Sequence, residues 1–471
     1  IGGGSAHLKA YYESHPLDAL KENLGASTKI EHSKGCHTYR YYPALDEKLI
    51  KNNTNTENGY LIEYFDHASN SKDPIHVEYG NGSKFWVFEG FAKDIIAKQE
   101  RPDIYVKFTC TYVPDISGFH DFELFAIGKS KLLIDDKLIV DNWSKVEQGD
   151  AFFAFASSPV KGRADLKKNQ EHRIEIQYKF EGNFPAIYIG CKTPDKIDLF
   201  AQAKKIAEES EQTILVVGTN SDWETEGNDR TDLELPGNQN ALIDAILEID
   251  PNTILVLNSG STKRMPCINK AKAVLQCWYP CEEFDNALFD VVMGDTNPSG
   301  RLPTSFPKRL EDTPAFKFYP GEDLQMNYEE DLLVGYKWYQ RQNIDTLYPF
   351  GYGLSYTSFE YSELSISEIN DCTYKCTFNI KNTGNVDGSD VAQCYVGIDS
   401  ANSNEPIKSL QGFDKVFIES GQEKTIEIIL NKRNFAQWDI KTKNWEIRTG
   451  NYEISIGASV DDIRLSSFVS L

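Results

Sequence analysis

The sequence has no uninterrupted apolar run of about 18 residues, the length that a membrane-spanning helix needs. It also has no excess of positive charge, because 71 acidic against 49 basic side chains give a formal net charge of −22. These two absences argue against a helical membrane protein and against binding to nucleic acid or to an anionic membrane surface. The composition that remains, 40% hydrophobic and 25% charged residues, is typical of a globular protein. At 471 residues the chain is long enough for two to four domains.

Cysteines are present, but they form no regular framework. There are nine, an odd number, and the pairs Cys277/Cys281 and Cys372/Cys376 each lack the second half of a zinc site. We therefore expect reduced thiols, no bound metal, no cofactor and a cytoplasmic location, with secretion as the alternative. The chain opens on IGGGSA without an initiator Met or a signal-peptide pattern. We expect the 471 residues to be a piece of a longer product or a processed one.

Two separated stretches carry an α/β pattern. In residues 199–325, helix-type sequences alternate with nearly continuous Ile/Leu/Val runs, which is typical of a parallel sheet covered on both faces. Residues 1–55 add a helix pattern at 16–25, begun by a proline and ended by a glycine, and then a short strand pattern at 28–36. We predict that the two stretches form one discontinuous, doubly wound α/β-sandwich domain.

The remaining residues predict β-structure. Residues 56–198 contain short alternating or aromatic-rich strand patterns separated by Gly, Asn and Asp turns, which predict an inserted β-sandwich. Residues 326–356 are irregular and aromatic, as expected for a linker or crossover. Residues 357–471 carry seven strand patterns at roughly ten-residue spacing, which predict an immunoglobulin-like sandwich.

The loop SDWETEGNDRTDLELP, residues 221–236, follows a strand pattern of the expected parallel sheet and is rich in charge. Open α/β sheets bind ligands beyond the carboxyl ends of their strands. A carboxylic acid held there beside the apolar ring of Trp223 would have a raised pKa and could donate a proton. Asp229 and Arg230 would pair and fix the loop. On charge alone, a solvated acidic loop is the alternative, because Glu-x-Glu is a weak signal by itself.

Several motifs together resemble glycoside hydrolase family 3, in the β-glucosidase form that carries an inserted protective-antigen-like domain. They are, in chain order, GGGSA (2–6), WETEGNDRTDLELPGNQ (223–239), NTILVLNSGS (252–261), GDTNPSGRLPTSFP (294–307), VGYKWY (334–339) and YPFGYGLSYTSFEY (348–361). LQGFDKV (410–416) and GNYEISIGAS (450–459) resemble the fibronectin type III-like tail of the same family. The resemblance covers essentially the whole chain and corresponds to the rear part of such an enzyme.

The resemblance implies hydrolysis of terminal, non-reducing β-D-glucosyl residues by double displacement with retention. In that family one carboxylate attacks the anomeric carbon and another protonates the leaving oxygen. The Glu-Gly-x-Asp-Arg pattern assigns the acid/base to Glu226, with Glu224 as the fallback. The family's nucleophile is an Asp on a preceding (β/α)8 barrel, and no Asp of this chain corresponds to it. We therefore expect the C-terminal portion of a retaining β-glucosidase, inactive alone because catalytic residues that act as a unit fail together.

In the relatives the inserted module shapes the leaving-group subsite, and an aromatic side chain at a loop tip suits that role. The candidates are Phe152 and Phe153 in GDAFFAFASS (149–158), with Trp223 as a further substrate-binding residue; core phenylalanines are the alternative. Some relatives of the module hold calcium through adjacent aspartates. Asp135 and Asp136 supply few of the oxygens that calcium needs and are typical of a hairpin turn.

The expected partners are a β-glucoside or oligosaccharide substrate and an upstream or separately encoded barrel, with a homo-oligomer left open. The alternative function is a non-catalytic carbohydrate-binding or adhesion protein. Glycan binding that survives Glu226→Ala but fails on changes at Phe152 and Phe153 would favour that alternative.

Overall fold

The computed structural model describes residues 3, 8, 10–25, 27–52, 58–65, 73–96, 105–182, 184–227, 229–323 and 325–471. The chain divides into two compact units. The first comprises Ile1–Tyr11, Lys29–Ser261 and Met265–Cys281, and the second comprises Tyr12–Thr28, Thr262–Arg264 and Glu282–Leu471.

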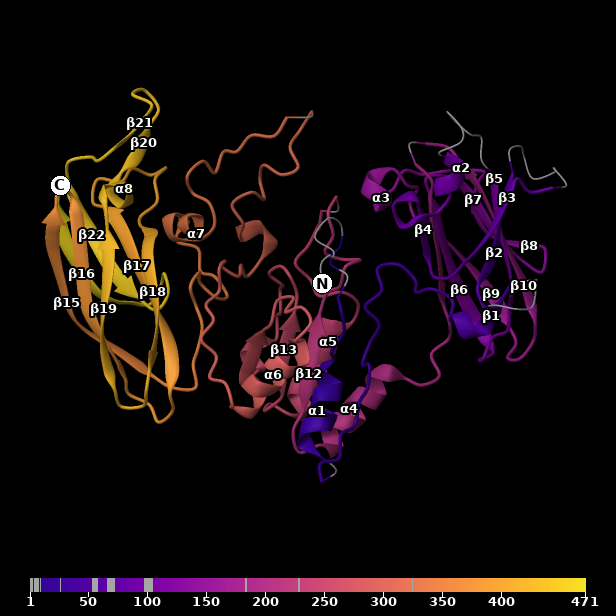
Figure 1. Cartoon of the computed structure of the whole chain (residues 1–471), viewed down its shortest axis with the longest axis horizontal. Coiled ribbons are helices and arrows are strands. Elements are labelled where there is room, and N and C mark those ends of the chain that lie inside the picture. The colour runs from indigo at the N-terminus through magenta and orange to yellow at the C-terminus, as the bar shows by residue number, and fades with distance from the viewer. Residues whose placement is uncertain are drawn as a thin grey trace. The chain divides into compact units, whose positions relative to one another are not determined.

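Most of the first unit is a sandwich of two antiparallel sheets (Figure 1). The larger sheet has the order β3-β2-β5-β10-β7-β8, with β1 also paired to β5, and the smaller has the order β4-β11-β6-β9. The strands are β1 (Ile50–Lys51), β2 (Tyr60–Phe65), β3 (His76–Gly80), β4 (Lys84–Trp86), β5 (Tyr105–Tyr112), β6 (Gly118–Ala126), β7 (Gly128–Ile134), β8 (Lys137–Asn142), β9 (Val160–Leu166), β10 (His172–Phe180) and β11 (Ala186–Lys192). The helices are η2 (Glu47–Leu49), η3 (Val87–Glu89), α2 (Lys93–Ile96) and α3 (Ala151–Ala154).

The core of this sandwich follows from the alternation of its strands. Phe108 and Ile176 of the larger sheet are fully buried in one cluster with Phe122 and Ile189 of the smaller sheet. Because successive side chains of a strand point to opposite faces, each strand contributes every second residue to this layer.

Asp135 and Asp136 form the two-residue turn between β7 and β8, as the sequence predicts. Their φ angles are 50° and 63°, the left-handed pair that a tight hairpin requires. Asp135 Oδ2 lies 2.7 Å from His172 Nδ1, and Asp136 accepts a hydrogen bond of 2.7 Å from Arg173. Both carboxylates thus contact basic side chains, and no group of side chains suited to a metal ion is found within the described ranges.

The first unit also contains a three-stranded parallel sheet with the order β12-β13-β14 (Figure 1). Its elements are α4 (Leu199–Glu209), β12 (Ile214–Gly218), α5 (Gln239–Ile249), β13 (Ile254–Asn258), η4 (Ile268–Lys270) and β14 (Ala273–Gln276). Asp198 caps α4 by accepting the Ala201 N–H at 3.0 Å. Ala207 of α4 packs on Leu242 and Ile246 of α5.

The strand expected at 28–36 is wrong, because this segment has no strand in the structure. It packs against helices instead of beside a strand. Ser33 Oγ donates to the Leu199 carbonyl at 3.3 Å, and Cys36 packs beside α4 and α5. Gly35 has a φ of 71°, which interrupts the extended backbone that a strand would need.

The second unit contains α1 (Pro16–Leu24), α6 (Phe284–Met293), η5 (Leu310–Asp312), α7 (Tyr336–Gln342), α8 (Lys432–Phe435) and a second β-sandwich. One sheet of this sandwich has the order β15-β16-β19 and the other has the order β18-β17-β22-β23, beside a ribbon of β20 and β21. The strands are β15 (Phe359–Asn370), β16 (Thr373–Asn382), β17 (Gly388–Ile398), β18 (Ser409–Ile418), β19 (Glu423–Leu430), β20 (Gln437–Asp439), β21 (Asn444–Glu446), β22 (Asn451–Gly457) and β23 (Ile463–Ser470). Phe378 and Ile428 of one sheet share a buried core with Cys394 and Ile454 of the other.

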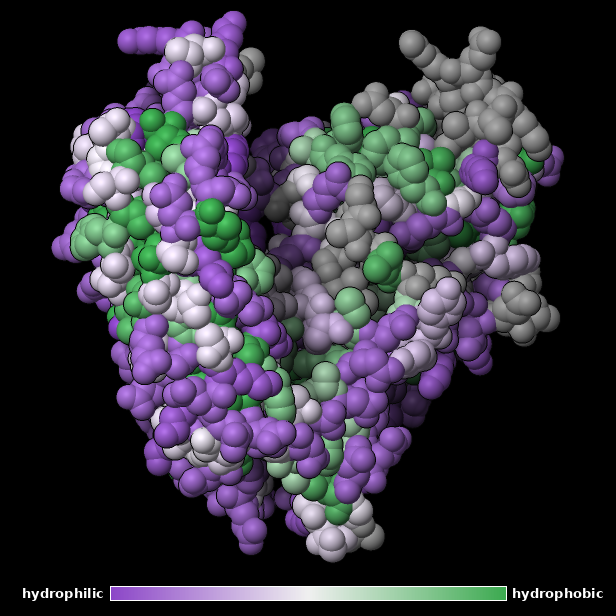
Figure 2. All heavy atoms as spheres, turned by 60° about the vertical axis from the view of Figure 1, so that its left-hand side comes forward, coloured by the Kyte–Doolittle hydropathy of each residue, from purple (hydrophilic) through white to green (hydrophobic). Residues whose placement is uncertain are grey.

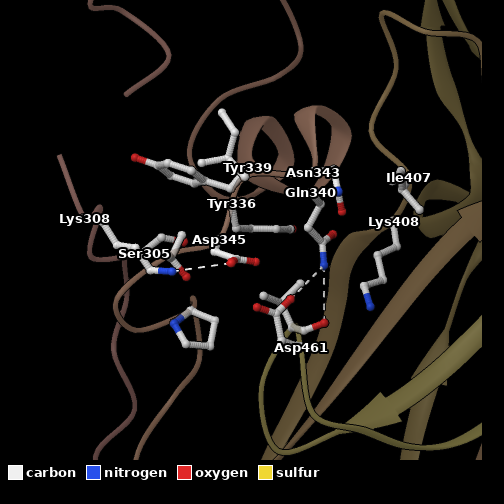
Figure 3. A pocket seen from close by; sticks show the side chains of 14 residues that line it. Ser305, Lys308, Tyr336, Tyr339, Gln340, Asn343, Asp345, Ile407, Lys408 and Asp461 are labelled. Carbon is white, nitrogen blue, oxygen red and sulfur yellow. Dashed lines mark hydrogen bonds and ion pairs between the residues drawn. The ribbon is translucent and has the colours of Figure 1, made fainter. Parts of the chain in front are cut away.

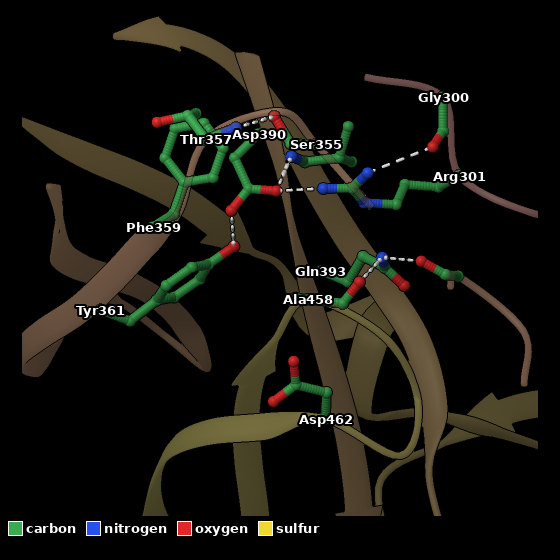
Figure 4. A network of polar contacts seen from close by, with 12 residues as sticks. Gly300, Arg301, Ser355, Thr357, Phe359, Tyr361, Asp390, Gln393, Ala458 and Asp462 are labelled. Atoms are coloured by element: carbon green, nitrogen blue, oxygen red, sulfur yellow. Dashed lines mark hydrogen bonds and ion pairs between the residues drawn. The ribbon is translucent and has the colours of Figure 1, made fainter. Parts of the chain in front are cut away.

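A buried ion pair ties the segment after α6 to this second sandwich (Figure 4). Arg301 donates to Asp390 of β17, which is only 1% exposed. The other oxygen of Asp390 accepts the Tyr361 hydroxyl at 2.9 Å. Gln393, further along β17, donates to the Gly351 carbonyl at 3.0 Å. Strand β17 therefore holds the preceding segment through Asp390 and Gln393, and β15 supports Asp390 through Tyr361.

The expected combination of an α/β layer, an inserted β-sandwich and an immunoglobulin-like sandwich is confirmed, while the domain bounds remain predictions. All nine cysteines are free thiols, in agreement with their irregular spacing. Across the described ranges, no helix combines the length and the apolarity needed to span a bilayer.

Candidate acid/base site

The charged loop begins where β12 ends and returns at the start of α5. Gly218, the last residue of β12, has a φ of 154°, and a Cβ there would lie 1.8 Å from the Asn258 carbonyl oxygen of β13. The Gln239 side chain accepts from the Gly218 N–H at 2.7 Å and donates to the Gly218 carbonyl at 2.9 Å. Both ends of the loop are thus fixed at the carboxyl edge of the parallel sheet, where such sheets bind ligands.

Glu224 is enclosed by hydrogen-bond donors. Its Oε2 accepts the Gly260 N–H at 2.7 Å, and its Oε1 accepts the Ser261 hydroxyl at 2.8 Å. Arg230 Nη1 lies 3.6 Å from Oε1, and the Glu224 side chain is 12% exposed. Burial, and secondarily the contact with Glu224, raises the pKa of Tyr279 to about 12. Glu224 therefore joins its loop to the loop that follows β13.

Glu226, two residues further on, is exposed. Gly227 follows it with a φ of 73°, in the left-handed region that favours glycine. The two glutamates of Glu-x-Glu therefore differ in environment: one is enclosed and the other faces solvent. From the sequence, only the family resemblance favoured Glu226 over Glu224 as the acid/base.

Arg230 fixes the loop, but through partners that the sequence did not indicate. Besides Glu224, it donates to the Glu234 carbonyl at 2.6 Å and to Asp232 at 3.3 Å. Asp229, which we expected as its partner, is exposed, and its pairing with Arg230 stays a prediction.

Phe153 of the inserted sandwich lies directly against this loop. A Cβ on Gly227 would be 3.0 Å from Phe153 Cδ1, so the absence of a side chain at Gly227 allows the ring to approach. Phe153 is 42% exposed, whereas Phe152 is partly buried, with its ring centroid 5.8 Å from Trp86 and 5.9 Å from Phe125. The structure thus places Phe153 beside Gly227, the residue after Glu226, and packs Phe152 against Trp86 and Phe125.

The backbone that presents Phe153 has an unusual conformation. Phe152, Phe153 and Ala154 have φ angles of 50°, 61° and 61°. Each left-handed residue other than glycine costs roughly 1–2 kcal/mol. The Gln148 side chain offsets part of this cost by donating to the Ala154 carbonyl and, at 3.3 Å, to the Ala156 carbonyl. Such conformations cluster at functional sites.

Further aromatic rings continue outward from Phe153. Phe88 and Phe155 are 69% and 47% exposed, and each has its ring centroid within 5.7 Å of that of Phe184. Figure 2 shows hydrophobic side chains gathered at the surface of this end of the inserted sandwich. The Trp86 ring, with its centroid 6.2 Å from Phe153 and 5.1 Å from Phe88, joins the Phe153 ring to this wider aromatic surface.

Arg40, which sequence reasoning missed, links the charged loop to the Phe153 loop. Its Nη1 donates to the Asp222 carbonyl at 2.9 Å, and its Nη2 donates to Asp150 Oδ2 at 2.7 Å. Its guanidinium also lies 5.9 Å from the centroid of the Trp223 ring. Trp223 in turn donates its indole N–H to the Thr38 carbonyl at 2.6 Å, so its polar edge anchors the loop.

The GGGSA motif contacts the same loop at the one position that the structure describes, Gly3. The Gly3 N–H donates to the Glu224 carbonyl at 2.8 Å. A Cβ on Gly3 would lie 2.4 Å from Thr225 Oγ1, which explains the glycine as a close backbone approach. The other residues of 2–6 lie outside the described residues.

Comparison with known proteins identifies the family. The glycosyl hydrolase family 3 C-terminal domain profile matches residues 1–356, and the fibronectin type III-like domain profile matches residues 390–460. A β-glucosidase of Rhizobium radiobacter is 33% identical and aligns with 100% of this chain and 57% of its own length. A probable β-glucosidase I of Aspergillus flavus is 32% identical over 93% of this chain and 54% of its own length.

Solved structures agree with the sequence comparison. The β-glucosidase of Kluyveromyces marxianus, solved in complex with glucose, has a TM-score of 0.87 at 30% identity, over 100% of this chain and 57% of its own. The β-glucosidase DesR of Streptomyces venezuelae, solved with D-glucose, has a TM-score of 0.67 at 28% identity, over 100% of this chain and 54% of its own. The chain spans little more than half the length of these relatives, and it belongs to glycosyl hydrolase family 3.

Proposed function

We propose that this chain is the C-terminal part of a retaining β-glucosidase and that Glu226 is its general acid/base. The observation that carries the proposal is the contrast between the two glutamates of the loop. Glu224 is surrounded by donors, and its geometry is that of a structural carboxylate. Glu226 is exposed beyond the carboxyl end of β12, with Phe153 against the next residue.

In the proposed reaction Glu226 donates its proton to the glycosidic oxygen while the bond from that oxygen to the anomeric carbon breaks. The attacking carboxylate comes from the (β/α)8 barrel of the family, about 5–5.5 Å from Glu226. In the second step Glu226 accepts a proton from the water that displaces the enzyme carboxylate from the anomeric carbon. Because the barrel carries the nucleophile, the chain alone is proposed to be inactive.

The contacts of Arg40, Arg230 and Gln239 serve this chemistry by fixing the loop before substrate arrives. A proton donor misplaced by about 1 Å can lose roughly two orders of magnitude in rate. Trp223 contributes through its bond to the Thr38 carbonyl, which makes it a positioning residue in this proposal.

Phe153 is proposed to form part of the leaving-group subsite. Its ring is exposed, rests on Gly227 and is held by a strained loop, so it can offer a fixed apolar surface to a sugar ring. The names of the relatives, and the glucose in two related structures, support a terminal β-D-glucosyl residue as the substrate.

A chimera tests the proposal. The barrel of the Rhizobium radiobacter relative is fused before residue 1, and hydrolysis of an aryl β-glucoside and of cellobiose is measured beside the chain alone. We expect turnover by the chimera and none by the chain alone. Glu226→Ala in the chimera should abolish cellobiose hydrolysis but retain part of the activity on a glucoside with a good leaving group.

Azide separates an acid/base from a structural glutamate. With Glu226→Ala, azide should accelerate turnover and yield β-glucosyl azide, because it attacks the glycosyl-enzyme without needing a general base. Glu224→Ala should show no such rescue. A folded chimera that lacks turnover, or one in which Glu226→Ala changes nothing, would overturn the assignment. If the chain without the barrel bound glycan, and this binding survived Glu226→Ala but failed on changes at Phe152 and Phe153, the carbohydrate-binding alternative would be favoured.

A further inference from the structure

The second unit contains a cavity that shares no residue with the acid/base loop. It has a volume of about 450 Å³ and lies between α7 and loops of the second sandwich (Figure 3). Ligand pockets commonly have volumes of about 300–1,000 Å³. The polar residues that decide its chemistry are Tyr336, Gln340, Asn343, Lys408 and Asp461.

Gln340 presents a buried acceptor without a partner. Its Nε2 donates to the Val460 carbonyl at 3.3 Å and to Asp461 Oδ1 at 3.4 Å, so the orientation of the amide is fixed. Its Oε1 is buried and accepts no hydrogen bond from the residues that the structure describes. An unsatisfied buried acceptor costs about 1–3 kcal/mol, which a bound hydroxyl donor would recover.

Lys408 supplies a complementary donor. Figure 3 shows its side chain extending beside the contact between Gln340 and Asp461. The side chain is half-buried, and among the described residues no carboxylate lies within ion-pair distance of its ammonium group. Burial lowers the pKa of Lys408, while Asp461 and Glu453 partly oppose that effect. The ammonium group, which lies 5.7 Å from the centroid of the Tyr395 ring, is therefore partly desolvated and could still donate to an oxygen of a ligand.

The balance of charge around the cavity favours a neutral ligand. Lys308 lies 3.4 Å from Asp345, and Asp461 faces the same space as Lys408, so two basic and two acidic side chains line it. An anion would meet two carboxylates, and a cation would meet two ammonium groups. A sugar hydroxyl both donates and accepts, so one saccharide can bond Gln340 Oε1 and Lys408 Nζ together.

Apolar surface is present for the C–H faces of a sugar. Ile407, beside Lys408, is 45% exposed. The Tyr336 ring stacks on Phe350 with its centroid 4.6 Å away, and its oxygen accepts the Leu410 N–H at 2.8 Å. The position of Tyr336 is thus fixed before any ligand binds.

From these observations we infer that the cavity beside α7 binds a neutral mono- or disaccharide, separately from the acid/base site. The inference does not depend on the proposed reaction. It concerns binding alone, and its failure would leave the assignment of Glu226 untouched.

The test uses the whole chain with labelled isoleucine methyl groups. Ile344 and Ile407 line the cavity, and Ile176 in the core of the inserted sandwich serves as the reference. Titration with cellobiose should shift the methyl signals of Ile344 and Ile407 with a dissociation constant of about 1 mM, and leave Ile176 unchanged.

Lys408→Met keeps the aliphatic stem and removes the donor, so it should weaken binding about tenfold. Lys415→Met, on an exposed position of β18, is the matched control and should bind as the parent does. Gln340→Met is the second variant and should also weaken binding, with an unchanged signal of Ile454, in the core of the second sandwich, showing that the fold around the cavity is intact. Three results would overturn the inference: no shift at Ile344 and Ile407, equal affinity in Lys408→Met, or binding of glucuronate without binding of cellobiose.

Discussion

Glu224→Ala should destabilise the loop, whereas Glu226→Ala should leave the stability of the loop nearly unchanged and remove the proposed proton donor, although the two residues are only two positions apart. Removing the Glu224 carboxylate leaves the Gly260 N–H and the Ser261 hydroxyl without their acceptor. Each hydrogen bond to a charged group contributes about 1.5–3 kcal/mol. Because the Glu224 side chain is 12% exposed, water can replace part of this loss. We expect the loop to open more easily by about 2–4 kcal/mol.

Hydrogen exchange of peptides within residues 219–235 measures this opening. A change of about 2–4 kcal/mol corresponds to roughly 30- to 800-fold faster exchange of the protected amides. Glu226→Ala is the matched control, and its exposed position predicts a change within about 0.5 kcal/mol. If exchange in this loop were unchanged by Glu224→Ala, or if Glu226→Ala accelerated it as much, the division of roles between the two glutamates would be wrong.

Three further predictions concern the free energy of unfolding, measured by urea denaturation. Glu123 is fully buried, and burial raises the pKa of its carboxyl group above 4.5. The folded protein therefore keeps this proton to a higher pH than the unfolded chain does. The free energy of unfolding consequently falls as the pH rises through the raised pKa. Glu123→Gln should therefore stabilise the protein at pH near 7 and have no effect at pH below about 4; equal effects at both would contradict this. Asp390→Ala should cost about 3–5 kcal/mol, because it leaves Arg301 buried without its partner, and a loss under about 1 kcal/mol would refute a critical role for the pair. Gly227→Ala should cost about 1–2 kcal/mol for its left-handed backbone and displace Phe153, so a double-mutant cycle with Phe153→Ala should show coupling.

The sequence predicts the regular elements wherever the pattern has one strong period. The apolar runs of β12 and β13 and the helix-type sequence of α5 are local properties, and all three elements form as predicted. β23 was missed although its residues alternate between partly buried and exposed, because its apolar positions are few and separated by polar ones. The helix α7 was missed because its sequence, YKWYQRQ, is aromatic and polar without an apolar face of helical period.

In the candidate site, too, a short stretch of sequence reveals some residues, whereas contacts between residues far apart in the sequence appear only in the folded chain. Glu226 could be proposed from the sequence because its motif is contiguous. Arg40 was not found, because its partners Asp222 and Asp150 are 182 and 110 residues away and only the folded chain brings them together. The different environments of the two glutamates could not be predicted either, because the donors to Glu224, Gly260 and Ser261, lie in the loop after β13.

The guanidinium of Arg40 bonds both the loop of Asp222 and the loop of Asp150, so the position of each loop depends on the other. A substitution that reshapes the aromatic loop near Asp150 also alters the support of the loop that carries Glu226. Under the proposed function, leaving-group preference and placement of the proton donor are therefore coupled properties. An engineer who grafts a new aromatic loop for a different aglycone would need to supply an acceptor for Arg40, or lose rate together with the old preference.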